Sequence, residues 1–134
     1  MSRSLIQTAN QSSQSVTAGS VISLGQALRR YGCNCRLNGN AIEIEGAGYY
    51  TISGTVTLTP AAVGNATVSL LLNGQPISGA TSTGSVSTVG NSVTLPIETT
   101  VRQGCNCEGA SAITCTLTVG DSTVTNISLR VEKK

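Results

Sequence analysis

The fold is decided at residues 48–59, which read GYYTISGTVTLT. In an extended chain one face of this segment is polar, and the other is formed by Tyr50, Ile52, Gly54, Val56 and Leu58. Alternation with a period of two predicts a β-strand that packs one face into a core. Because this is the strongest periodic pattern in the chain, we expect an all-β protein.

Short β-prone segments continue on both sides of this strand, separated by Gly, Asn and Pro. The dipeptide Asn73-Gly74 suits a turn with positive φ at both central residues, so a hairpin is predicted there. A turn around Gln26 to Tyr31 is the one plausible helix, and it is too short to form a layer. Further strands are expected at 15–17, 20–24, 41–45, 65–72, 75–78, 82–88, 92–102, 112–119 and 122–132.

About eight to ten strands without a helical layer predict a two-sheet antiparallel sandwich, although periodicity alone does not choose between jelly-roll and immunoglobulin-like topology. The 134 residues suit one domain. Residues 1–14 are mostly polar and lack a period, so they are expected to form an N-terminal arm that attaches the domain, residues 15–134, to something else.

The composition points to association. Charged residues make up 10% of the chain, against about 25% in ordinary globular proteins, and there is no Phe or Trp. A surface rich in Thr, Ser, Asn and Gly and poor in charge favours oligomerisation. The net charge of +2 does not favour nucleic acid or acidic lipid as a partner.

Three segments together decide between the topologies: Gly46-Ala-Gly-Tyr-Tyr-Thr-Ile-Ser-Gly-Thr-Val, then Val68-Ser-Leu-Leu-Leu-Asn-Gly-Gln-Pro-Ile, and finally Ile127-Ser-Leu-Arg-Val-Glu-Lys. In this order they resemble the C1q/TNF-like jelly roll, in the version found in bacterial spore-surface collagen-like glycoproteins and in phage or prophage proteins. The residues that carry the resemblance include Gly48, Tyr50, Ile52, Asn73 and Gly74.

The resemblance covers roughly residues 40 to 132 and implies a compact homotrimer whose first and last strands lie close together. It implies assembly and recognition, not catalysis. Two departures are a missing Gly-x-y collagen stalk and the presence of two Cys-Asn-Cys motifs. The missing stalk favours a virion or surface component over the tip of a spore filament. Of Tyr49 and Tyr50, one is expected to cover the core and the other to lie on an outer or intersubunit face.

The repeated Cys-Asn-Cys motif is the one feature that composition does not explain; its cysteines are Cys33, Cys35, Cys105 and Cys107. Residues i and i+2 of an extended segment point to the same side, so four thiolates could surround a zinc ion if the two motifs meet. A disulfide between the motifs is the direct alternative, and free thiols are another. The Cys-x-Cys spacing favours the last two over zinc. Cys115 is expected to be a small buried hydrophobe between Ile113 and Leu117.

Catalytic groups are scarce. The chain has no His, which removes the commonest general base. Glu43 and Glu45 share one strand face and could do acid/base work, but a solvated face explains them better. Arg29, Arg30 and Arg36 form a small basic cluster without interleaved aromatics, which is too little for a nucleic-acid site. No catalytic residue and no cofactor are expected.

A phage or prophage structural protein is therefore the leading hypothesis: a homotrimeric jelly roll that decorates a capsid or forms a fibre head, with a capsid or other virion protein as its partner. Without a signal peptide or membrane span, it is expected to be made in the bacterial cytoplasm and located in the virion, or alternatively on a cell or spore surface. The alternative function is a receptor- or carbohydrate-binding trimer that uses the loops around Asn73, 83–92 and 104–111.

Overall fold

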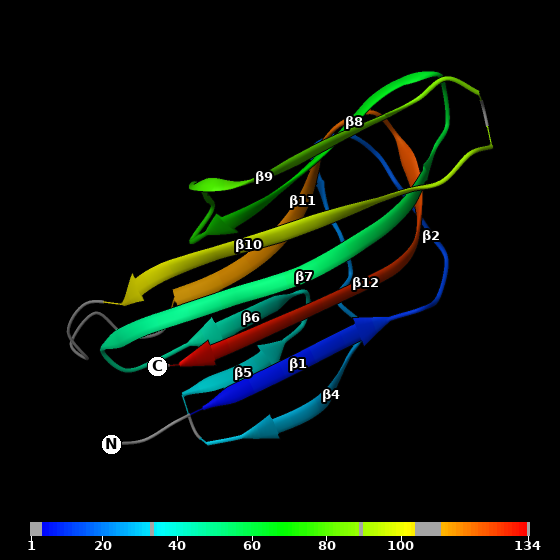
Figure 1. Cartoon of the computed structure of the whole chain (residues 1–134). Helices are drawn as coiled ribbons and strands as arrows, with labels where there is room; N and C mark the ends of the chain where they lie inside the picture. Colours follow the sequence, from blue (N-terminus) through cyan, green and yellow to red (C-terminus); the bar gives the residue numbers. More distant parts are fainter. Residues whose placement is uncertain (1–3, 33, 89, 104–110, 134) are drawn as a thin grey trace.

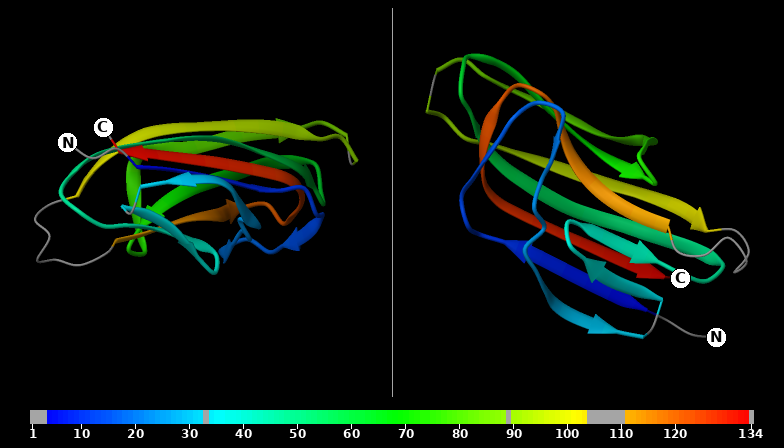
Figure 2. Two further views of the ribbon diagram at one scale, coloured as in Figure 1. Left: turned by 90° about the horizontal axis from the view of Figure 1, so that it is seen from below. Right: turned by 180° about the vertical axis from the view of Figure 1, so that it is seen from behind.

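A computed structural model describes residues 4–32, 34–88, 90–103 and 111–133. These residues contain no helix and form two antiparallel six-stranded sheets, which pack as two layers (Figures 1 and 2). The predicted all-β sandwich is confirmed, and the described residues form twelve strands in place of the eight to ten expected. No helix long and apolar enough to span a membrane occurs in this part of the chain.

The first sheet, sheet A, has the strand order β10-β7-β12-β1-β4, and the short strand β2 pairs with β12. The first long strand, β1, therefore lies directly against the last, as the family resemblance implies. Leu5 is opposite Glu132 and Asn10 is opposite Ile127. The bounds are β10 (Val93–Gln103), β7 (Gly48–Pro60), β12 (Ser122–Lys133), β1 (Leu5–Asn10), β4 (Gln26–Tyr31) and β2 (Gln14–Val16).

The second sheet, sheet B, has the order β5-β6-β11-β8-β9, and β3 pairs with β11. The turn predicted at Asn73-Gly74 joins β8 to β9, and both residues have positive φ (52° and 85°). The segments expected at 75–78 and 82–88 are one continuous strand, β9. The bounds are β5 (Cys35–Asn38), β6 (Ala41–Ile44), β11 (Ser111–Val119), β8 (Gly64–Leu72), β9 (Gln75–Val86) and β3 (Ser20–Val21).

The core lies between the sheets, and β7 supplies its largest side chain, Tyr50, which is fully buried. Aliphatic side chains fill the rest of the space because the chain has no Phe or Trp. Gly54 allows the two central strands to approach closely, since a Cβ there would collide with the carbonyl oxygen of Ser128 on β12. The other largest fully buried side chains are Ile6, Ile22, Leu24, Ile42, Ile44, Ile52, Leu58, Leu70, Ile113, Leu117 and Ile127.

The N-terminal segment was expected to be a free attachment arm, and this is wrong for residues 5–10. They form β1, which pairs with β12 on one side and with β4 on the other (Figure 1). Ile6 and Thr8 point into the core. The predicted boundary at residue 15 also falls inside β2. The polar composition of this segment hid the strand, because only two side chains of β1, those of Ile6 and Thr8, have to fit into the core.

The helical turn expected at Gln26 to Tyr31 is also wrong, because this segment is strand β4 at the edge of sheet A. All six residues are exposed, so there is no apolar face that a helix could bury. Pairing with β1 holds this segment in an extended conformation. The register shifts between Gln7 and Thr8 of β1, so Leu28 of β4 has no partner residue on β1.

Candidate functional site

A polar surface rich in hydroxyl groups is formed by the outward face of β7, β10 and β12, which we call the hydroxyl face. Most of its side chains are Thr or Ser, and several bond across strands. Thr57 Oγ1 lies 3.1 Å from Thr94 Oγ1, and Thr59 Oγ1 lies 2.8 Å from Ser92 Oγ. Such pairs satisfy the hydroxyls within the sheet, so less hydration is lost if another surface covers them.

Charges on the hydroxyl face are few and of both signs. Ser53 lies between Glu98 on β10 and Arg130 on β12. Further along toward one end, Glu132 is opposite Thr51, and Arg102 is opposite Tyr49. The middle of the face, around Thr55, has only Pro96 and Ser128 as its cross-strand neighbours. This centre is uncharged and suits contact with another protein.

The two adjacent tyrosines take the two roles expected of them. Tyr50 is buried, and its hydroxyl donates to the carbonyl oxygens of Glu45 (2.9 Å) and Gly46 (2.8 Å). Burial, with smaller contributions from Cys35 and Glu45, raises the pKa of Tyr50 to about 12, so the ring stays neutral. Tyr49 is 58% exposed at the end of the hydroxyl face.

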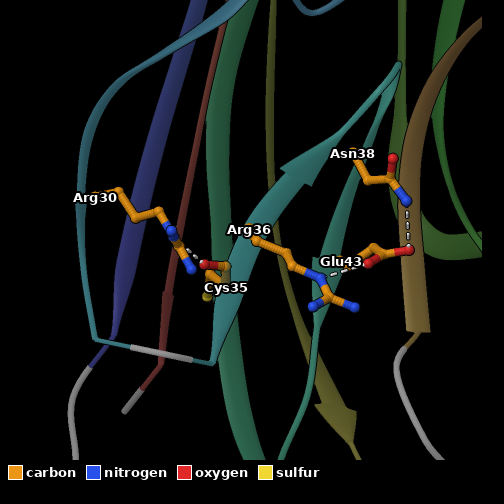
Figure 3. A network of polar contacts seen from close by, with 5 residues as sticks. All are labelled: Arg30, Cys35, Arg36, Asn38 and Glu43. Atoms are coloured by element: carbon orange, nitrogen blue, oxygen red, sulfur yellow. Dashed lines mark hydrogen bonds and ion pairs between the residues drawn. The ribbon is translucent and has the colours of Figure 1, made fainter.

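The carboxylate pair considered for acid/base work is not arranged for it. Arg36 Nε donates to Glu43 Oε1 (2.6 Å) and Asn38 Nδ2 donates to Glu43 Oε2 (3.2 Å), as Figure 3 shows. The hydrogen bond from Arg36 holds the pKa of Glu43 below its ordinary value, with Asn38 adding to the effect. A general acid needs the opposite shift. Glu45 is exposed beside them.

The basic cluster of Arg29, Arg30 and Arg36 is divided between different partners. Arg36 is paired with Glu43, whereas Arg30 Nε donates to the carbonyl oxygen of Cys35 (2.8 Å; Figure 3). Arg29 lies on β4 opposite Gln7, and no ion pair forms with it among the residues that the structure describes. The three cations therefore do not converge on one ligand.

Of the four cysteines in the Cys-Asn-Cys motifs, the structure describes only Cys35, which is a free thiol in the core. Burial raises the pKa of Cys35 to about 11, although Arg30 and Lys133 act in the opposite direction. Cys33, Cys105 and Cys107 lie outside the described residues, so the disulfide and zinc alternatives stay open. Within the described ranges, no three His, Cys, Asp or Glu residues are placed to hold a metal ion.

The middle residue of the first motif, Asn34, joins three parts of the chain. Asn34 Oδ1 accepts from Ser4 Oγ (2.8 Å) and its Nδ2 donates to the carbonyl oxygen of Glu45 (2.6 Å). Its backbone N–H donates to Ser4 Oγ (3.1 Å), and Lys133 N–H donates to the Ser4 carbonyl (2.8 Å). Asn34 thus connects Ser4, just before β1, to Glu45 in the turn before β7, and Ser4 in turn bonds Lys133 at the end of β12. The sequence did not indicate this role.

The loops considered for ligand binding are only partly described. Around Asn73, the side chain is already used: its Oδ1 accepts from Ala112 N–H (2.9 Å) and its Nδ2 donates to Ser111 Oγ (3.3 Å). Ser111 Oγ in turn donates to Gln103 Oε1 (2.7 Å). Residues 89 and 104–110 lie outside the described part of the chain. Cys115 is buried between Ile113 and Leu117, as expected.

Comparison with known proteins depends on structure, since neither protein-family models nor curated sequences give a match. Murine APRIL superposes with a TM-score of 0.75 at 13% identity, covering 99% of this chain and 100% of APRIL. The globular domain of zebrafish complement 1qA protein gives 0.69 at 6% identity (96% and 94% covered). PRD1 vertex protein P5 gives 0.65 at 11% identity (98% and 96% covered).

The sheet order and these likenesses define an antiparallel jelly-roll domain that spans nearly the whole chain. More narrowly, the fold is the C1q/TNF-like jelly roll, so the fold that the sequence resemblance implied is confirmed. At identities of 6–13% the likeness establishes the fold and leaves function to be argued from the molecule's own surfaces.

Proposed function

We propose that this protein is a non-enzymatic structural module that forms a homotrimer through its hydroxyl face and acts as a virion component, either as capsid decoration or as a fibre head. The observation that carries the proposal is the hydroxyl face itself. Its centre around Thr55 is uncharged, and two pairs of its hydroxyls, Thr57 with Thr94 and Thr59 with Ser92, are bonded across strands.

Burying such a face costs less than burying an ordinary charged surface. An unpaired buried hydroxyl costs roughly 1–3 kcal/mol, whereas a hydroxyl that keeps its cross-strand partner avoids most of that penalty. Tyr49, at the end of the face, adds an exposed aromatic ring of the kind enriched at interfaces. These features favour a stable contact with a second protein surface.

The fold resemblance supports the trimer, and the resemblance together with the composition supports the virion role. Among similar folds, PRD1 vertex protein P5 is by its name a component of a vertex, which supports the same kind of role here. Non-enzymatic action is supported by the lowered pKa of Glu43, by the raised pKa of Cys35 and by the absence of His from the sequence.

The assembly is tested by light scattering on the purified chain and on two arginine variants. Thr55→Arg places a cation at the centre of the hydroxyl face, opposite Pro96 and Ser128, and should convert a trimer to monomers. Ser85→Arg places the same charge on the exposed outward face of β9 in sheet B and should leave the trimer intact. A wild-type monomer, or equal behaviour of the two variants, would contradict the proposed seam.

The virion role is tested separately by mass spectrometry of purified particles from cells that express the gene. Detection at a fixed ratio to the capsid protein is expected, and washing in high salt should not remove it. Failure to co-purify with any particle would overturn the virion role even if the trimer is confirmed.

A receptor- or carbohydrate-binding trimer is the alternative, and the described loops do not favour it. The amide of Asn73 is committed to Ser111 and Ala112, so it is not free to bind a sugar. A glycan array with a specific hit would nevertheless place recognition ahead of a purely structural role.

A further inference from the structure

Among the described residues the strand orders of the two sheets end in four edge strands, apart from the two- and three-residue strands β3 and β2, and three of the four are poorly suited to pairing with another strand. On β10, Pro96 removes one N–H donor from the middle of the strand. β9 contains Pro76 and Gly79, and its Gly84 lies so close to β10 that a Cβ would meet Val93 and Leu95 side chains at 2.7 Å. β5 has only four residues. Protein edges are commonly protected by such means.

The fourth edge, β4, lacks these protections. It has six residues without Pro or Gly, all of them exposed, and among the described residues its one pairing partner is β1. Figure 1 shows β4 as the outermost strand of sheet A, beyond β1. On its outer side, no strand of the described part of the chain pairs with its backbone N–H and C=O groups. Leu28 and Tyr31 are 59% and 50% exposed there, which is high for apolar and aromatic side chains.

The charge around β4 is positive. The strand carries Arg29 and Arg30 and no acidic residue. Arg29 is in register with Gln7 and, one strand further, with Arg130. The two arginines therefore share one row of the sheet, on strands whose backbones lie about 10 Å apart. Glu132 lies in the next row, opposite Leu5. A second copy of β4 would bring two arginine pairs together, whereas an acidic strand would neutralise them.

We propose that β4 is a docking edge that accepts an extended acidic segment of a partner protein as an additional strand of sheet A. Its backbone pairs with residues 26–31. A carboxylate lies beside Arg29 and an apolar side chain, two residues away on the same face, lies beside Tyr31. This interaction goes beyond the proposed trimer, which uses β7, β10 and β12 and leaves β4 uncovered.

A shallow groove at the start of β4 extends the docking edge. It has a volume of about 460 Å³, and its lining includes Asn10, Gln11, Gln26 and Leu28. Gly25 forms part of it because the chain passes close to β1 there, and a Cβ would meet the carbonyl oxygen of Ala9 at 2.5 Å. The groove has room for one further side chain of the incoming segment, with Leu28 as its apolar wall.

The test uses a blocked, labelled peptide, Thr-Val-Thr-Glu-Thr-Val-Thr, and a matched peptide with Lys in place of Glu. Fluorescence anisotropy should give a dissociation constant between about 10 µM and 1 mM for the acidic peptide and weaker binding for the basic one. Amides of residues 26–31 should exchange more slowly in the complex. Two isomers of the acidic peptide, N-methylated at alternate residues, should differ, because only one set of N–H groups faces β4.

The variant Arg29→Glu should weaken binding of the acidic peptide about tenfold and make the basic peptide the better ligand. Ser85→Glu adds a carboxylate on the exposed outward face of β9, outside both the hydroxyl face and the docking edge, and should change neither affinity. Reversal of preference is a readout that damage to the fold would not produce. The proposal is overturned by absence of binding up to about 1 mM, by equal binding of both N-methyl isomers, or by concentration-dependent protection of β4 without peptide, which would make a second copy the occupant.

Discussion

Asn73 and Ala112 bond each other in both directions: Ala112 N–H donates to Asn73 Oδ1 (2.9 Å), and Asn73 N–H donates to the Ala112 carbonyl (2.8 Å). The turn between β8 and β9 is thereby fastened to the start of β11, 39 residues further along the chain. Asn73 also has φ of 52°, a conformation that few residues other than Gly adopt without strain.

We predict that substitutions of Asn73 reduce stability for two separate reasons: loss of the side-chain hydrogen bonds and strain in the backbone conformation. Asn73→Gly keeps the backbone conformation and removes the side-chain bonds, at a cost of about 1–2 kcal/mol. Asn73→Ala removes the same bonds and also places in the left-handed region a residue that tolerates this conformation less well than Asn or Gly, at a further cost of about 1 kcal/mol. Urea unfolding of the three proteins measures both. If the alanine variant is at least as stable as the glycine variant, the conformational part of the explanation is wrong.

The central strands were predictable from sequence because each carries its own two-residue period. The alternation at residues 48–59 gave the inward face of β7, and the same holds for Ile42 and Ile44 on β6. Asn73-Gly74 located a turn by its local chemistry alone. The alternation and the turn depend only on residues that are close together in the sequence, so they can be predicted without knowing the three-dimensional structure.

The strands that sequence reasoning missed depend on distant partners. Leu5 is paired with Glu132, and without that strand the polar segment around it has too little apolar surface to predict a sheet. β4 has no inward apolar face at all and is extended because β1 lies beside it. The sequence pattern therefore did not reveal the docking edge. One signal was present: Gln26–Tyr31 contains neither Pro nor Gly, as an edge strand open to pairing requires.

Ionisation of Cys115 should make stability fall at high pH. Burial raises the pKa of this thiol from near 9 to about 12. Between these values the unfolded chain releases the proton while the folded chain keeps it, so the free energy of unfolding decreases as pH rises. Urea midpoints measured at about pH 8 and about pH 10 should show a larger decrease for the wild type than for Cys115→Ala. Equal decreases would show that other groups cause the loss.

The ion pair of Arg36 and Glu43 should shift the titration of Glu43 measurably but should change the free energy of unfolding only slightly. Its hydrogen bond lowers the pKa of Glu43, so the pair stabilises the fold above the ordinary pKa, and that contribution is lost as pH falls through the lowered value. The effect on stability is small because both groups are in contact with solvent. NMR titration should show the Glu43 pKa returning upward in Arg36→Met, and added salt should have a similar but weaker effect. An unchanged titration in the variant would contradict the pairing.

The hydroxyl of Thr8 is a buried polar group whose removal should increase the stability of the fold. Thr8 points into the core from β1, is 1% exposed, and its Oγ1 has no hydrogen-bond partner among the described residues. A buried hydroxyl without a partner costs roughly 1–3 kcal/mol, and valine has nearly the same shape, so Thr8→Val should stabilise the fold by about 1 kcal/mol. Thr57→Val is the matched control, because it makes the same change on the hydroxyl face, where Oγ1 is paired with Thr94, and should give no gain. The urea midpoints of both variants, compared with that of the wild type, test this prediction. A loss of stability in Thr8→Val would contradict it. Such a loss would mean that this hydroxyl is bonded in solution and that β1 packs more tightly against its neighbours than the structure indicates.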